Sequence, residues 1–132
     1  GIRLGADAVA GEAAQLRDAA ALRQAAPRLE ELAVRDDHKL YLAIAHRAWG
    51  VAHRLAGELP AAETRLKQAL ELFSEMETRW QTGRTLVELA ELELARPDQA
   101  GAREYFTRAL AAFETLQAGP DAERTRAALQ AK

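Results

Sequence analysis

Apolar residues recur every three or four positions in two stretches of the chain that lie forty residues apart. The first stretch consists of Ala62, Leu66, Ala69, Leu70, Phe73 and Met76, and the second of Ala102, Phe106, Ala109, Leu110, Phe113 and Leu116. This spacing is typical of a helix with one buried face. A turn that contains proline precedes each stretch, at residues 55–60 and 96–98. The pattern therefore predicts an internal repeat.

The rest of the chain predicts five further helices. Residues 2–16 are weakly amphipathic, and Asp18 is a plausible N-cap for a second helix, kinked where the Pro27 ring clashes with the preceding turn. Residues 36–38 supply a turn and an N-cap for a helix over 39–56, whose two apolar sides place it between neighbours. With the two repeat helices, over 60–76 and 98–117, and two more over 79–95 and 120–130, the count is seven.

These elements predict an all-α protein, a right-handed stack of antiparallel helix hairpins. Because the turns are short, consecutive helices must lie side by side and antiparallel. A length of 132 residues suits one domain, 1–132. Within it we expect a divergent first helix pair (1–37), two repeats (38–77 and 78–118) and a terminal helix (119–132). Because the chain begins at Gly1 without methionine, we expect it to be a fragment of a longer protein.

Composition narrows the function classes. Apolar residues make up 48 % of the chain but aromatic residues only 5 %, so the core is expected to consist mainly of alanine and leucine. Eighteen basic and 20 acidic residues give a net charge of −2, which disfavours binding of nucleic acid through phosphates. No cysteine is present, and no apolar run approaches the roughly 18 residues of a membrane span. The expectation is a cytoplasmic protein without a membrane partner.

Candidate chemistry is sparse. His46 and His53 lie one heptad apart without a third ligand, and because two buried unpaired histidines would be costly, we expect them on the polar face. Residues 36–38 (Asp-Asp-His) are expected to act as a helix cap, Ser74 has no triad partner at suitable spacing, and the glycines are scattered singly. Glu88, Glu91 and Glu93, with Arg84, are expected to form a solvated face. The sequence therefore predicts no catalytic residues, no metal site and no cofactor.

The two repeat units resemble the tetratricopeptide repeat. The matching positions of the first copy are Gly50, Gly57, Ala62, Leu66, Ala69 and Leu70, and those of the second are Leu86, Leu89, Ala90, Pro97, Ala102, Phe106, Ala109 and Leu110. The period of forty exceeds the usual 34 or so, and His46 and His53 stand where the family has bulky buried residues. The long form is similar to helical-repeat tails of large bacterial signalling and regulatory proteins. The resemblance implies a non-catalytic scaffold that binds a protein or peptide.

In this family the first helix of each pair lines a concave groove. The resemblance thus places Arg47, Val51 and Arg54 in the groove from one pair, and Val87, Glu91 and Leu94 from the next. We expect the valines and Leu94 to make apolar contacts and the two arginines to favour an acidic partner. The alternative is a structural spacer or a homodimerisation module, in which exposed apolar residues of the first helix pair two copies of the chain: Ile2, Val9 and Leu16.

Overall fold

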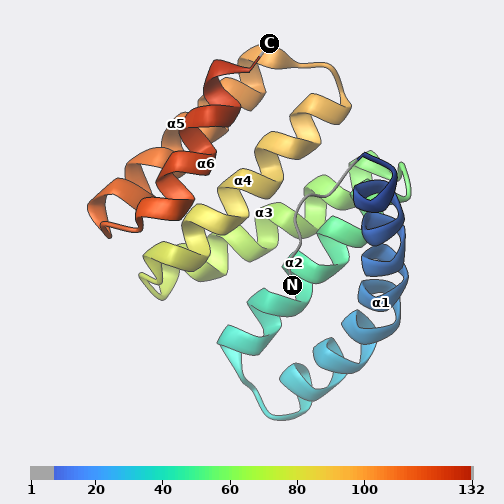
Figure 1. The fold of residues 1–132 in the computed structure, drawn as a ribbon. Coiled ribbons are helices and arrows are strands. Elements are labelled where there is room, and N and C mark those ends of the chain that lie inside the picture. The colour runs from blue at the N-terminus through green and yellow to red at the C-terminus, as the bar shows by residue number, and fades with distance from the viewer. Residues whose placement is uncertain (1–7, 132) are drawn as a thin grey trace.

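The computed structural model describes the backbone of residues 8–131 and the side chains of residues 20–131. These residues form six helices: α1 (Ala8–Arg35), α2 (Lys39–Leu55), α3 (Leu59–Glu75), α4 (Arg79–Ala95), α5 (Gln99–Thr115) and α6 (Gly119–Gln130). Each helix packs against the next in chain order, so the chain advances as a row of antiparallel hairpins (Figure 1). The all-α hairpin stack predicted from the sequence is confirmed.

The predicted count of seven helices is wrong, because the two helices expected in the first 37 residues are one. Helix α1 is 28 residues long and runs through Pro27 without ending. Both Pro27 and Arg23, whose carbonyl loses its helical donor at the proline, lie on the exposed side of α1, where water can replace the lost bond. Ile2 and the side chains of Val9 and Leu16, which were expected to mediate dimerisation, lie outside the described residues.

The forty-residue period has a simple structural basis. Helices α2, α3, α4 and α5 each contain 17 residues and are joined by three-residue turns. In all five turns between the described helices, the middle residue has positive φ: Asp37 (52°), Gly57 (82°), Glu77 (57°), Pro97 (26°) and Gln117 (57°). In the turn after α2, the Gly57 N–H donates to the Arg54 carbonyl and the Glu58 N–H to the His53 carbonyl, which is the Schellman arrangement. One helix and one turn thus occupy twenty residues.

Helix starts agree with the sequence signals. His38 caps α2 by accepting a hydrogen bond from the Tyr41 N–H, and Asp98 caps α5 by accepting one from the Gly101 N–H. Pro60 and Pro120 lie in the first turns of α3 and α6, where a missing N–H costs nothing. The caps predicted at residues 36–38 and at Asp98 are confirmed.

The core lies between the helices of each hairpin and between successive hairpins. Phe73 and Phe113, equivalent positions on α3 and α5, are both completely buried. The close approach of the helices depends on glycine in two places. A Cβ at Gly50 would lie 2.5 Å from Leu66 Cγ, and one at Gly83 would lie 2.7 Å from Phe113 Cε1. Small residues on α2 and α4 therefore set the spacing within each hairpin.

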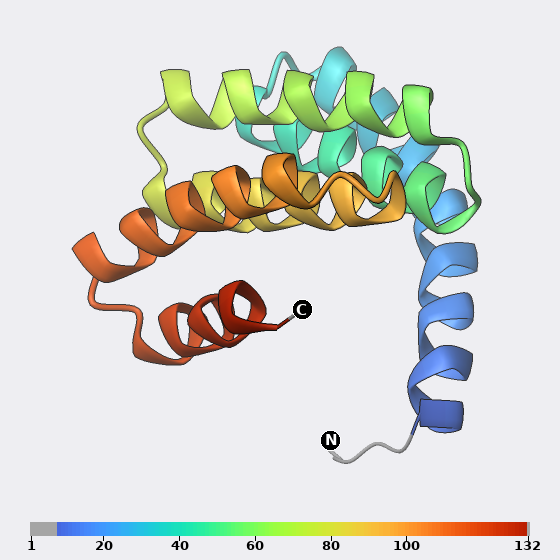
Figure 2. The same cartoon turned by 90° about the horizontal axis from the view of Figure 1, so that it is seen from above.

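Helix α6 and the N-terminal half of α1 project to the same side of the α2–α5 block, at opposite ends of the row (Figure 2). Helices α2 and α4 are in direct contact, and α6 packs on α5. The sequence-predicted groove residues lie on α2 and α4, and two of them, Val87 and Glu91 of α4, line a pocket that α6 completes.

Candidate protein-binding groove

The arginines predicted to line the groove are engaged within the molecule. Arg54 of α2 donates from Nη2 to Glu88 Oε1 of α4 at 3.3 Å, while Arg84 donates to the other oxygen of Glu88 at 3.2 Å. The Arg54 side chain is only 19 % exposed. A cation that is bonded and largely covered in this way is a poor attractant for a partner's carboxylate.

Arg47 is likewise committed to α4. Its Nη1 donates to the Gln81 carbonyl and to the Thr85 hydroxyl, each at 3.4 Å, and its guanidinium stacks 5.0 Å above the Phe73 ring. Burial and the nearby Arg84 cation lower the Arg47 pKa to about 10. The residue therefore remains charged at neutral pH and joins α2 to α4.

Glu88 corrects the expectation that the glutamates of α4 form a solvated face. It is buried, with 9 % of its surface exposed, and Glu93 is covered as well. Burial of Glu88 is tolerated because guanidinium groups from two helices occupy both of its oxygens. The predicted pair between Arg84 and Glu88 forms, but as part of an inter-helix network instead of a surface contact.

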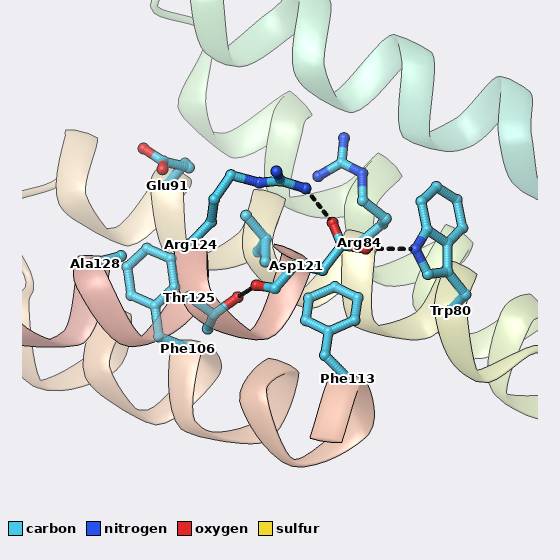
Figure 3. A pocket seen from close by; sticks show the side chains of 10 residues that line it. Trp80, Arg84, Glu91, Phe106, Phe113, Asp121, Arg124, Thr125 and Ala128 are labelled. Atoms are coloured by element: carbon cyan, nitrogen blue, oxygen red, sulfur yellow. Dashed lines mark hydrogen bonds and ion pairs between the residues drawn. The ribbon is translucent and has the colours of Figure 1, made fainter. Parts of the chain in front are cut away.

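A pocket of about 360 Å³ opens between α4, α5 and α6 (Figure 3). Its apolar lining comes from Phe106 and Phe113 of α5, with Val87 of α4 and Ala128 of α6. Charged and polar side chains surround these groups: Trp80, Arg84, Glu91, Asp121, Arg124 and Thr125. A concave site with an apolar lining and few polar groups is suited to receive a side chain of a ligand or partner.

One end of this pocket is closed by a hydrogen-bonded set. The indole N–H of Trp80, a residue 44 % exposed, donates to Asp121 Oδ2 at 3.0 Å, and Arg124 is bonded to the other oxygen of Asp121. The bond from Trp80, and then the bond and charge of Arg124, lower the Asp121 pKa. Figure 3 shows Asp121 between its two partners. All three side chains at this end thus have fixed partners.

Glu91 lies at the other end of the pocket, beside Ala128 (Figure 3). It is half-buried, and no hydrogen bond or ion pair reaches it from the described side chains. Burial is the main cause that raises its pKa; the Arg54 cation opposes this and the neighbouring Glu88 adds to it. Glu91 is therefore the open anionic group of the pocket.

Leu94, the remaining predicted groove residue, lines a second pocket of about 100 Å³. This pocket shares Phe106 and Ala128 with the larger one, so the two are neighbours along α4. Leu94 is 45 % exposed, while Val51 and Val87 are half-buried. Of the six predicted residues, Val87, Glu91 and Leu94 line pockets, whereas Arg47 and Arg54 face α4 in bonded contacts.

Several pocket residues escaped the sequence prediction. Phe106 and Phe113 were identified only as core, yet they also line the pocket. Asp121 and Arg124 were missed because α6 was interpreted only as a terminal helix. Extending the forty-residue period by one step places Arg124 in register with Arg84, and this signal was present in the sequence.

The expectation that both histidines lie on the polar face is wrong for His46, which is buried at 8 % exposure. Its Nδ1 lies 3.0 Å from Arg65 Nη1, and Arg65 also donates to Glu30 Oε2 at 2.8 Å. Glu30 accepts a second bond from the Trp49 indole N–H at 3.0 Å. Burial and the Arg65 charge lower the His46 pKa, so neutral imidazole is favoured there. This network joins α1 to the α2–α3 hairpin.

Among the side chains of residues 20–131 there is no group of acidic residues and histidines that could hold a metal ion. None of the described helices is long and apolar enough to cross a membrane.

Paired helices of equal length, repeated with a fixed period and exposing a lined pocket, define a helical-hairpin repeat protein. Comparison with protein families gives the particular class: residues 40–115, more than half of the chain, match the tetratricopeptide repeat. The chain belongs to the tetratricopeptide repeat family. Domains of this family are generally protein-interaction modules and typically non-catalytic. Neither the curated proteins nor the solved structures contain a match to this chain.

Proposed function

We propose that this domain binds a segment of a partner protein in the pocket between α4, α5 and α6. The observation that carries the proposal is the pocket itself, about 360 Å³ in volume and lined by two aromatic rings with charged groups around them. The neighbouring pocket beside Leu94 extends the apolar surface along α4. A bound segment would therefore run along α4, with apolar side chains in the two pockets.

The resemblance to long-period repeat tails supports placing this module in a larger bacterial signalling or regulatory protein of the cytoplasm. In such a setting the α2–α3 and α4–α5 hairpins act as the rigid scaffold. Arg47, Arg54 and Glu88 serve to hold α2 against α4. The binding surface is then formed mainly by α4 and α6.

Peptide selection tests this proposal directly. A random peptide library displayed on phage is selected on the purified chain, and a selected peptide is titrated into isotopically labelled protein. We expect amide shifts concentrated on α4 and α6. Leu94→Glu is expected to weaken binding about tenfold or more, because it places a charge against an apolar contact.

The matched control is Val34→Glu, which introduces the same charge at an exposed apolar residue of α1. It should leave binding unchanged. Shifts confined to the outer surfaces of α3 and α5 would refute the groove. Failure to select any peptide would favour the alternative, a spacer or self-association module.

A further inference from the structure

Some of the charged side chains around the α4–α6 pocket have an oppositely charged partner and one does not. Arg84 is bonded to Glu88, and Arg124 is bonded to Asp121. Glu91 is the acidic group that faces the pocket without a partner among the described side chains. An anion that remains open beside an apolar surface attracts a cation that also brings apolar atoms with it.

We propose that the partner segment carries an arginine or lysine whose cationic group pairs with Glu91 while its neighbouring apolar side chain occupies the space beside Phe106. The inference rests on the proposed function and specifies the chemistry of its ligand. It reverses the preference for an acidic partner that the sequence suggested. The reversal follows because the arginines that suggested an acidic partner are bonded to α4.

The geometry of the pocket matches this chemistry. Glu91 and the Phe106 ring lie at one end of the pocket, and Trp80 with Asp121 lies at the other, where Phe113 is found (Figure 3). The alkyl part of an arginine or lysine buries favourably along such a surface while its charged end reaches an acid. The raised pKa of Glu91 indicates that, in the free protein, the nearby Arg54 cation does not offset the effect of burial on the carboxylate.

An acidic ligand has no comparable site in the α4–α6 pocket itself; the exposed cation Arg103, which donates to the Leu129 carbonyl, lines the neighbouring pocket. Arg54 Nε lacks an acceptor among the described residues, but that atom is buried and out of a partner's reach. The two cations that line this pocket, half-buried Arg84 and exposed Arg124, are each already paired with a carboxylate, which reduces their attraction for a further anion. Glu91 has no such pair among the described side chains, so a basic residue there meets a charge that is still open.

The experiment is a double-mutant cycle between Glu91 and the basic residue of a selected peptide. A synthetic peptide from the phage selection is compared with a copy in which arginine is replaced by citrulline, or lysine by acetyl-lysine. We expect the neutral copy to bind the unaltered chain about tenfold more weakly than the basic peptide does. On the Glu91→Gln variant, the affinities of the two peptides should differ by less than about twofold. Glu104→Gln, the same change at an exposed position of α5, should keep the tenfold difference.

Charge reversal supplies an independent measurement. Glu91→Lys is expected to weaken the basic peptide and to recover binding when the peptide's basic residue is replaced by glutamate. Equal loss from the neutral peptide in the unaltered chain and in Glu91→Gln would overturn the inference. So would groove-binding peptides without any basic residue, although these would leave the proposed function standing. Peptides that bind away from α4 and α6 would remove the proposed function itself.

Discussion

Some turns of this protein hold a non-glycine residue in a left-handed backbone conformation, which lowers the stability of the fold and can be corrected by substitution. Glu77 and Gln117 adopt left-handed backbone angles, with φ of 57° at both, where glycine is the favoured residue. Both side chains are exposed and make no hydrogen bond with the described residues. Replacing either residue by glycine removes a strained Cβ without removing a contact. We therefore expect Glu77→Gly and Gln117→Gly each to increase the stability of the fold.

The magnitude follows from two opposing terms. A left-handed non-glycine residue costs about 1–2 kcal/mol, whereas the greater freedom of glycine in the unfolded chain takes back about 0.4–1 kcal/mol. The net gain is about 0.5–1 kcal/mol per site. For the double variant, a gain of about 1–2 kcal/mol corresponds to a rise in Tm of roughly 3–8 °C in a domain of this size.

Urea and thermal unfolding followed by helical circular dichroism measure this gain. Two controls bracket it. Gly57 has φ of 82°, and a Cβ added there would have no atom within 4 Å, so Gly57→Ala should cost about 1 kcal/mol through backbone strain alone. Glu71→Gly, on the exposed side of α3, should also cost about 1 kcal/mol, because its backbone is helical. If Glu77→Gly proved as harmful as Glu71→Gly, the turn geometry would be refuted.

Three further outcomes are expected. Gly83→Ala should lower the free energy of unfolding by about 1–3 kcal/mol because its Cβ would lie 2.7 Å from Phe113, whereas Gly119→Ala, with open space around it, should change it by less than about 0.5 kcal/mol in urea titrations. Phe113→Ala should cost about 3–5 kcal/mol in the same assay. Hydrogen bonds from Arg96 and Lys67 lower the Glu63 pKa to about 2. The carboxylate therefore stabilises the fold above pH 4.5, and this stabilisation disappears as the pH falls toward 2. The Glu63→Gln variant should lack this part of the pH dependence of unfolding.

The fold was predictable because its determinants are local and repeated. The two apolar stretches that contain Phe73 and Phe113 identify one buried face per helix, and both rings are indeed buried. Asp98 and Pro60 mark helix starts by backbone chemistry that needs no tertiary information. The continuity of α1 was missed because Asp18 resembles an N-cap, although no turn-forming sequence accompanies it.

Polar residues in the interior were less predictable, since their placement depends on partners from other helices. His46 can be buried because Arg65 of α3 supplies a hydrogen-bond partner, and Glu88 because Arg54 of α2 does. Neither partnership has a signature in local spacing. Amphipathicity alone places such residues outside, and the register between helices brings them inside.

That register also explains why the groove is open at one place and closed at another. Arg47 and Arg54 of α2 meet Thr85 and Glu88 of α4, and the contact is polar and bonded. One period later the equivalent residues are Val87 and Leu94 on α4, and Thr125 and Ala128 on α6.

This second interface lacks those two arginines and the buried acid, and among the described residues one side-chain hydrogen bond, from Trp80 to Asp121, joins α4 to α6. The apolar surface that remains lines the two pockets, which share Ala128. Between Val87 and Leu94 in the sequence lies Glu91, the α4 equivalent of Val51. The second interface therefore has a charged side chain where the first has an apolar one. Equivalent positions of the repeat thus form a closed polar contact between α2 and α4. Between α4 and α6 they leave exposed the apolar surface and the acidic group that the proposed partner requires.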